Sequence, residues 1–363
     1  MIEYENLKKA NEIFFPELKD AFNDFLESGW FILGDSVKRF EQNFASFCQT
    51  KYCIGVASGL DALILSLKAL ELPKGSEVIV PSNTYIATIL AILNEGLIPV
   101  LVEPKIETYN IDPSLIESSI TDKTRAIIPV HLYGKACEMT EIYSIAEKYS
   151  LNIIEDCAQA HGASINGKKV GSFGDFGAFS FYPTKNLGAI GDAGAITTND
   201  KNRYEKLLAL RNYGSEKKYY NKYIGVNSRL DEIQAKVLDI KLKKLDLITE
   251  HKRKLASIYS DLLTEKVKKP VLHYKYFDVF HIYNICTSRR DELKEYLLSK
   301  GIKTEIHYPV VPVDQECMVG IINGESSIAR KIHNETLSLP ISFATSIEDV
   351  KNVSREINLF FEN

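Results

Sequence analysis

The 363-residue sequence lacks the features that define several classes of protein. Its six cysteines stand singly, without a C-x-x-C pair, which favours reduced thiols over a disulfide scaffold or a zinc site. Lys and Arg total 44 against 48 Asp and Glu, so the chain as a whole lacks the excess positive charge that favours binding of nucleic acid. The longest apolar run, near residues 86–93, contains a threonine and is too short to span a bilayer, and residues 1–11 lack a signal-like apolar core. We expect a soluble, cytoplasmic protein with neither nucleic-acid nor membrane partners.

The composition that remains is that of a folded globular chain, with 45% hydrophobic and 25% charged residues. Between residues 51 and 200, short apolar or β-branched runs alternate with segments of helical period. The seven candidate strands are residues 53–57, 77–80, 98–102, 126–130, 151–155, 178–181 and 195–198. This alternation predicts an α/β fold with a mostly parallel sheet between helices, in which ligands bind beyond the carboxyl ends of the strands.

The pattern changes after residue 268, and a smaller α+β unit is predicted there. A charged amphipathic segment, residues 230–263, reads as one long helix that links the two parts. The later elements are predicted strands at residues 283–287 and 302–306 and helices at 292–300, 326–334 and 346–360, with Gly301 ending the first of these helices. We predict a large domain over residues 1–249 and a small one over residues 250–363.

The densest chemical signal lies in residues 174–188, where a strand of small residues runs into a loop. The loop presents the hydroxyl of Ser180 and, five residues later, the amine of Lys185, followed by a glycine-rich stretch. Glycines alone are typical of any tight turn in an α/β protein. A lysine in such a loop is different, because burying its charge is costly unless the amine is paired or deprotonated. A partly desolvated amine is what Schiff-base chemistry requires.

Two further segments offer chemical groups at strand ends. An apolar strand ends in Glu155 and Asp156, and a carboxylate there could hold a proton on a heterocyclic nitrogen; a role for Asp156 as a cap of the next turn is equally consistent. Ser58 and Gly59 lead from a strand into a helix, which suits either an anion site or a simple N-cap. His161 is interpreted as structural, because no second ligand accompanies it, and no metal site is expected.

A phosphate cradle, an amine and a strand-end carboxylate together form the set that pyridoxal 5′-phosphate requires. The sequence also resembles the DegT/StrS group of sugar-nucleotide aminotransferases, which are fold-type I pyridoxal-phosphate enzymes. The motifs that carry the resemblance span nearly the whole chain: residues 29–34, 56–59, 81–85, 131–134, 155–162, 174–194, 227–235 and 307–309. The resemblance implies a fold-type I large domain with a seven-stranded sheet, a small C-terminal domain and a homodimer with shared active sites.

The resemblance also implies roles for individual residues. Lys185 would form the Schiff base with the cofactor, Asp156 would pair with the pyridinium nitrogen, Gln159 would lie near the phenolic oxygen and Tyr85 would stack on the ring. The implied phosphate ligands are Ser58, Gly59, Leu60 and Ser180, with Asn227 supplied by a second subunit. The implied contacts to the nucleotide sugar are Tyr182, Arg229, His307 and Tyr308. Two departures are visible: Leu60 stands where many relatives carry Thr, and residues 310–314 differ from the common pattern.

The predicted reaction is transfer of an amino group from L-glutamate to carbon 3 of a thymidine-diphosphate 3-keto-6-deoxyhexose. Lys185 favours transamination over the dehydration carried out by relatives that have lost the lysine. Gln159 favours carbon 3, whereas relatives that act at carbon 4 more often have His at this position. Carbon-4 transfer and a non-catalytic regulator on the same fold stay as alternatives. A nicotinamide dehydrogenase is not favoured, because no G-x-G-x-x-G follows the first strand.

Overall fold

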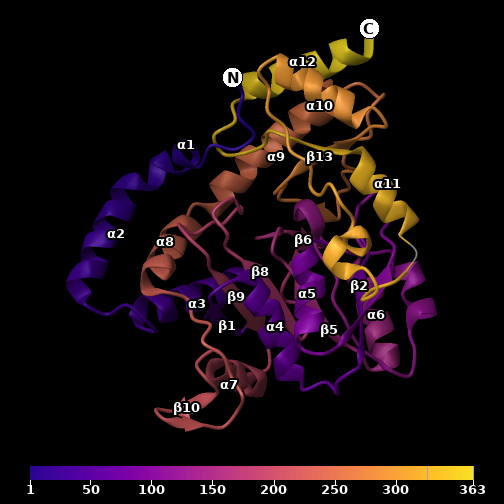
Figure 1. The fold of residues 1–363 in the computed structure, drawn as a ribbon. Helices are drawn as coiled ribbons and strands as arrows, with labels where there is room; N and C mark the ends of the chain where they lie inside the picture. The colour runs from indigo at the N-terminus through magenta and orange to yellow at the C-terminus, as the bar shows by residue number, and fades with distance from the viewer. Residues whose placement is uncertain (325, 363) are drawn as a thin grey trace.

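A seven-stranded sheet forms the centre of the computed structural model, which describes residues 1–324 and 326–362 (Figure 1). Residues 325 and 363, both in the predicted small domain, lie outside the described residues. The strands, in their order across the sheet, are β1 (Tyr52–Val56), β9 (Gly194–Thr198), β8 (Phe176–Ser180), β5 (Asn152–Asp156), β4 (Thr124–Ile127), β2 (Glu77–Pro81) and β3 (Ile98–Val102). Only β9 runs against the others. The predicted α/β fold-type I architecture is confirmed, and β4 alone departs from its predicted bounds by more than two residues.

Helices cover both faces of the sheet, and the alternation of side chains along each strand assigns residues to the two layers. In β5, Ile154 packs in one cluster with residues of α4 (Gly59–Leu70), α5 (Ile86–Asn94) and α7 (Lys201–Leu210). Its neighbour Ile153 packs on the opposite face with α6 (Met139–Tyr149). On that opposite face, Phe179 of β8 packs with α3 (Asp35–Phe47) and α8 (Glu232–Leu242). The sheet is therefore buried on both sides, as parallel sheets require.

The C-terminal part is built on a two-stranded ribbon, β13 (Tyr283–Cys286) and β14 (Thr336–Leu339), whose strands are antiparallel. It is covered by α9 (Leu245–Leu262), α10 (Arg290–Ser299), α11 (Ser327–Glu335) and α12 (Ile347–Glu362). Leu255, Tyr259, Leu339 and Val353 pack in one separate core cluster there. Gly301 follows α10 with a positive φ of 76°, as expected of a glycine that ends a helix.

Three expectations for this part differ from the structure. Residues 302–306 form only isolated bridges, Ile302 to Ile2 and Glu305 to Ser338, because they pair with different segments in turn. Strand β14 was not expected from the sequence. The segment 230–263 forms two helices, α8 and α9, separated at residues 243 and 244. The chain changes direction there, since α8 packs on α3 over the sheet whereas α9 packs on α12.

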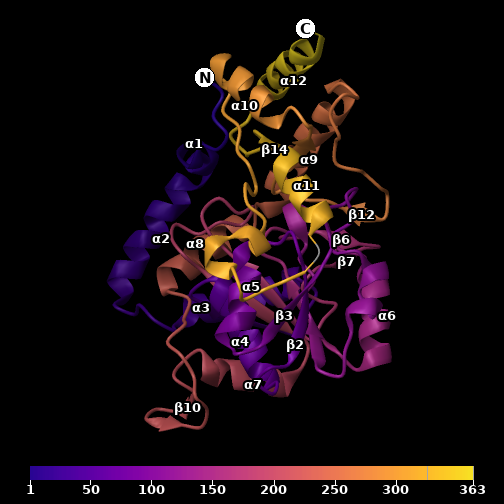
Figure 2. The same cartoon turned by 45° about the vertical axis from the view of Figure 1, so that its right-hand side comes forward.

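The remaining elements lie at the periphery. Helices α1 (Leu7–Asn11) and α2 (Phe15–Ser28) run along one flank, at the left of Figure 1, and the hairpin β10 (Ser215–Lys217) with β11 (Tyr220–Asn221) projects from the body in both views (Figures 1 and 2). A small antiparallel sheet consists of β12 (Tyr276–Phe277), β6 (Ser164–Ile165) and β7 (Lys168–Lys169). All six cysteines are free. Among the described residues, no helix is both long enough and apolar enough to cross a bilayer.

Candidate active site

Asp156 is the last residue of β5 and is almost completely buried. Its Oδ2 accepts a hydrogen bond of 2.8 Å from the hydroxyl of Thr88, and its Oδ1 accepts one of 3.1 Å from the backbone N–H of Ala158. Burial raises the pKa of Asp156, while these two hydrogen bonds and the nearby Lys185 amine act to lower it. The carboxylate therefore lies in a site that favours a cationic partner.

Lys185 lies in the turn that follows β8, beside Asp156. Its backbone N–H donates to the carbonyl of Tyr182 at 2.8 Å, which closes the turn. Burial lowers the pKa of the Lys185 amine to about 8, although the charge of Asp156 acts in the opposite direction. A substantial fraction of this amine is uncharged just above neutral pH, which is the form that attacks a carbonyl group.

Ser58, Gly59 and Leu60 start helix α4 at the carboxyl end of β1. The Ser58 hydroxyl accepts from the N–H of Asp61 at 3.1 Å, so the N-cap reading is correct. The first intrahelical bond is donated by Ala62, which leaves the N–H groups of Gly59 and Leu60 without an intrahelical acceptor. A Cβ on Gly59 would lie 2.5 Å from the Cβ of Ser180, so only glycine allows this close approach. The structure thus brings the four predicted phosphate ligands together.

Gln159 joins the predicted cofactor-site residues to the C-terminal part of the chain. Its Oε1 accepts from the N–H of Tyr133 at 2.7 Å, and its Nε2 donates to the hydroxyl of Tyr308 at 2.8 Å. The ring of Tyr308 lies 4.9 Å from that of Tyr85, which is half exposed. Residues 85, 159 and 308, far apart in the sequence, therefore meet at this site.

His307 is held beside Tyr308 by two hydrogen bonds. Its Nδ1 pairs with the hydroxyl of Ser338 at 2.9 Å, and its carbonyl accepts from the hydroxyl of Tyr133. Burial, together with the charge of Lys185, lowers the pKa of His307 to about 4. This imidazole is therefore neutral at physiological pH.

Asn227, Arg229 and Tyr182 are arranged differently from the other predicted residues. Asn227 forms a β-bridge with Asn212, and Arg229 donates to the side chain of Asn212 at 3.0 Å. Among the described residues, these contacts tie Asn227 and Arg229 to the base of the β10–β11 hairpin rather than to Lys185. Tyr182 is close to Lys185 in the chain, but half of its surface is exposed.

Comparisons with known proteins agree with this geometry. Residues 15–358 match the DegT/DnrJ/EryC1/StrS aminotransferase family. The chain belongs to this family. It is 51% identical, over 99% of both chains, to a dTDP-3-amino-3,6-dideoxy-alpha-D-galactopyranose transaminase of Aneurinibacillus thermoaerophilus. It is also 41% identical, over 99% of this chain and 97% of the other, to a pleiotropic regulatory protein of Geobacillus stearothermophilus.

A solved structure of a family member has the same fold. The structure of DesV from Streptomyces venezuelae, in complex with a ketimine intermediate, superposes with a TM-score of 0.96 at 41% identity. The alignment covers 99% of this chain and 98% of that one. The chain therefore has the fold of the DegT/DnrJ/EryC1/StrS aminotransferases.

Sequence reasoning did not single out Thr88, which supports the site of this family member from α5. Its hydroxyl also shares a 2.8 Å hydrogen bond with Thr84 and is fully buried. The only signal in the sequence is a hydroxyl within an apolar helix, which by itself is typical of a satisfied core threonine.

Glu155 and His131 form a buried structural pair under the site. Glu155 accepts from the N–H groups of Gly171, Phe173 and Gly174 at 2.8–2.9 Å and lies 3.1 Å from His131 Nε2. His131 Nδ1 accepts from the N–H of Cys137, so Nε2 carries the proton. These hydrogen bonds occupy both ring nitrogens of His131 and the carboxylate of Glu155, which cluster with Cys157.

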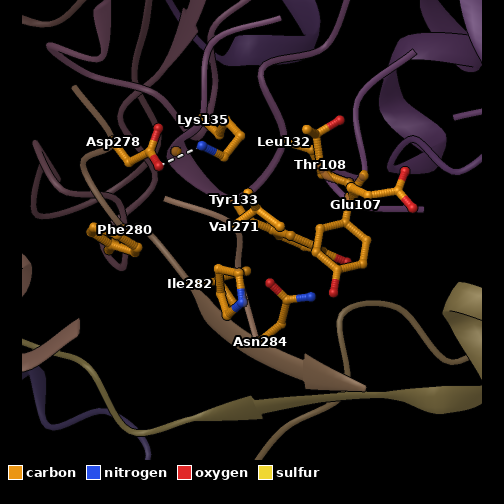
Figure 3. A pocket seen from close by; sticks show the side chains of 13 residues that line it. Glu107, Thr108, Leu132, Tyr133, Lys135, Val271, Asp278, Phe280, Ile282 and Asn284 are labelled. Carbon is orange, nitrogen blue, oxygen red and sulfur yellow. Dashed lines mark hydrogen bonds and ion pairs between the residues drawn. The ribbon is translucent and has the colours of Figure 1, made fainter. Parts of the chain in front are cut away.

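A further pocket is lined in part by Tyr133 (Figure 3). Apolar side chains, among them Val271 and Ile282, form much of its wall. At one edge, Lys135 forms a 2.6 Å ion pair with Asp278, drawn as a dashed line in Figure 3. The backbone and hydroxyl of Tyr133 contact Gln159 and His307, so this residue separates the pocket from the candidate active site.

Proposed function

We propose that the protein is a pyridoxal-phosphate-dependent aminotransferase that moves an amino group from L-glutamate to carbon 3 of a thymidine-diphosphate 3-keto-6-deoxyhexose. The observation that carries the proposal is the Lys185 amine, with a pKa of about 8, beside the buried Asp156 carboxylate in a chain of this family. The choice of carbon 3 rests on the similarity to a transaminase named for a 3-amino-3,6-dideoxy sugar.

The residues present fit this cofactor. The start of α4 offers free N–H groups, and glycine at position 59 lets this helix start approach Ser180 closely, where a Cβ would clash. Backbone N–H groups and the positive end of a helix favour a phosphate there. Leu60 contributes only its N–H group, since it has no hydroxyl. The exposed ring of Tyr85 is available for stacking, and Asp156 is placed to hold a proton on the pyridine nitrogen.

When bound, pyridoxal phosphate supplies an electron sink that makes the proton on the reacting carbon acidic. Lys185 Nζ is the group that would bind the cofactor's aldehyde and, as a free amine, would move a proton between the reacting carbon and its neighbour. Asp156 would keep the ring nitrogen protonated, and the hydrogen bonds from Thr88 and Ala158 favour its carboxylate form. His307, Tyr308, Tyr182 and Arg229 are the proposed contacts of the nucleotide sugar.

We further propose that the active unit is a homodimer, in which Asn227 of each chain reaches the phosphate site of the other. Helix α2 and the segment after it expose several large apolar side chains, including Phe22, Leu26 and Trp30, of which Trp30 is 63% exposed. A groove between α2 and α8 is lined by Phe22 and by Ile190, which lies five residues after Lys185. Contiguous apolar surface of this kind is typical of an interface.

The substrate is tested by offering glutamate with 3-keto and with 4-keto thymidine-diphosphate hexoses and weighing the products by mass spectrometry. We expect amination of the 3-keto compounds, and a strong preference for the 4-keto compounds would overturn the choice of carbon 3. Lys185→Ala should lower turnover by at least about a thousandfold, because it removes both the covalent anchor and the base. Lys201→Ala, at an exposed lysine, is the matched control.

A regulatory role is the second candidate, because one relative is named as a pleiotropic regulatory protein. Purified protein with pyridoxal phosphate should show an absorption band that borohydride bleaches and traps on Lys185. A regulator would show the band without amino transfer to any keto sugar, whereas the proposed enzyme shows both.

A further inference from the structure

Two buried lysines from consecutive helices reach the loop that carries Lys185. Lys252 of α9 donates a 2.7 Å hydrogen bond to the side-chain oxygen of Asn186, the residue directly after Lys185. Lys241 of α8 donates to the carbonyl of Gly188, two residues further along. Each of these lysines is only 4% exposed. The two lysines therefore hold the loop at Asn186 and Gly188, just after Lys185 in the chain.

Asn186 is held by hydrogen bonds of its own, and these also restrict the backbone of the neighbouring Lys185. Its Nδ2 donates to the carbonyl of Val279 at 2.8 Å while its Oδ1 accepts from Lys252. Lys252 Nζ also lies 3.4 Å from the carbonyl of His281. The side-chain amide thus has a defined partner on each side, one from α9 and one from the chain before β13.

Lys241, Lys252 and Glu5 line one pocket together with Lys185, and the charges around the two lysines do not balance there. Glu5 is the acid that acts on both, and it raises the pKa of each amine, but burial has the larger effect and lowers both to about 8. Burial raises the pKa of Glu5 in turn. One carboxylate for two amines leaves an excess of positive charge behind Lys185.

The remaining titratable groups around Lys185 come from the other packed elements. Burial and the positive charge of Lys185 lower the pKa of His161, His281 and His307, so these side chains are neutral. Asp156 is the acid that opposes the effect of burial on Lys185. Lys185 and Lys252 line the same pocket, so repulsion between their like charges disfavours protonation of both amines. In line with this geometry, the charge of Lys185 lowers the pKa of Lys252.

We propose, on the basis of the function proposed above, that Lys252 and Lys241 are positioning residues that fix the loop of Lys185, and that the charge of Lys252 disfavours protonation of the Lys185 amine. We call Lys252, Asn186 and Lys241 the clamp. The clamp keeps the side chain of Lys185 directed toward the candidate active site. It also ties the geometry of the reactive amine to α9, which packs in the C-terminal core.

The first test needs no cofactor. Lys185 is labelled with formaldehyde and cyanoborohydride over a range of pH and followed by peptide mass spectrometry. We expect Lys252→Met to move the midpoint of Lys185 labelling upward by about one pH unit, because a neighbouring positive charge is lost. Lys252→Gln, which keeps an N–H donor for Asn186, should show the same shift, and Lys252→Arg should restore the wild-type midpoint. The control is Lys254→Met, at an exposed lysine of the same helix.

The second test uses the protein loaded with pyridoxal phosphate. We expect Lys252→Met to raise the pH midpoint of the cofactor absorption band and to lower kcat about tenfold with little change in KM, because the clamp acts on the amine and not on the sugar. Should Lys252→Met fail to fold, Lys252→Gln and Lys241→Met provide the same readouts. Lys241→Met should lower kcat through the Gly188 contact.

The outcomes separate this inference from the proposed function. A wild-type protein that binds no pyridoxal phosphate refutes the proposed function, while the labelling midpoints still decide on the clamp. If the Lys252 variants fold and their Lys185 is labelled with the same pH midpoint as in Lys254→Met, the charge effect is overturned. Unchanged kcat in both Lys252→Met and Lys241→Met overturns the positioning role.

Discussion

At the scale of single residues, the site depends on opposing effects of burial and hydrogen bonding. Burial pushes Asp156 toward its neutral acid form and Lys185 toward its neutral amine. The proposed chemistry needs Asp156 charged and Lys185 uncharged, so burial assists the lysine but opposes the aspartate. The hydrogen bonds from Thr88 and Ala158 therefore have a specific task, which is to hold the carboxylate ionised.

Thr88→Val tests whether the Thr88 hydrogen bond keeps Asp156 ionised, with almost no change in side-chain shape. The Thr88 hydrogen bond lowers the pKa of Asp156, so its removal raises that pKa and the carboxylate takes up a proton at a higher pH. We expect the acid limb of the kcat profile to move upward by up to about one pH unit. The measurement is kcat against pH with a 3-keto sugar nucleotide. Thr108→Val, in the pocket of Figure 3, should leave the profile unchanged.

At the scale of elements, a single carboxylate joins the sheet to helix α11. Glu103 follows β3, and its oxygens accept from the N–H groups of Ile328 and Ala329 at 2.8 and 3.0 Å and from the Ser82 hydroxyl at 2.8 Å. Helix α11 therefore receives its N-terminal cap from a residue more than two hundred positions away. A carboxylate in this place also interacts favourably with the helix dipole.

Glu103→Gln should lower the free energy of unfolding by about 1 kcal/mol, because the amide keeps one acceptor but loses the charge. Urea denaturation followed by circular dichroism measures this loss. Glu107→Gln is the matched control, since Glu107 is exposed and lies 3.7 Å from its partner Lys268. Equal midpoints for the two variants would show that the cap contributes nothing.

Local sequence patterns predicted most elements but not all of them. Strands β2 and β8, for example, are mostly apolar, and most of their residues are buried on both faces of the sheet. Residues 302–306 have apolar residues only at Ile302 and Ile306. They pair in turn with Ile2 and Ser338 and form no regular strand. The break between α8 and α9 was missed because the amphipathic period continues across residues 243 and 244, where the helix turns from one core to another.

At the scale of the whole molecule, both ends of the chain lie near the C-terminal core (Figure 1). Ile2 pairs with Ile302, and its backbone N–H donates to the carbonyl of Gly301 at 2.8 Å. The division into residues 1–249 and 250–363 stays a prediction, and its boundary falls within α9. The same helix provides Lys252, so the proposed clamp lies at this boundary.

Phe22→Glu tests the proposed homodimer. Phe22 is 48% exposed in the single chain, so the substitution should leave the fold of the monomer intact, but it places a charge in the proposed apolar interface. Sedimentation should change from a dimer to a monomer, and turnover should fall with it because Asn227 no longer completes the neighbouring site. Leu298→Glu, at a leucine of α10 that is 59% exposed, should remain dimeric. A dimeric Phe22→Glu protein would place the interface elsewhere.

The sequence by itself determined the alternating strands and helices, the amine of Lys185 and the strand-end acid Asp156, because these depend on patterns within a few residues. It also determined the family, through motifs spread along nearly the whole chain. Only the tertiary structure decided that Thr88 bonds Asp156, that Tyr308 meets Gln159 and that Lys252 and Lys241 grip the loop of Lys185. The physical reason is that these contacts join residues up to about 150 positions apart, and such pairs are set by how whole helices and strands pack rather than by local preference.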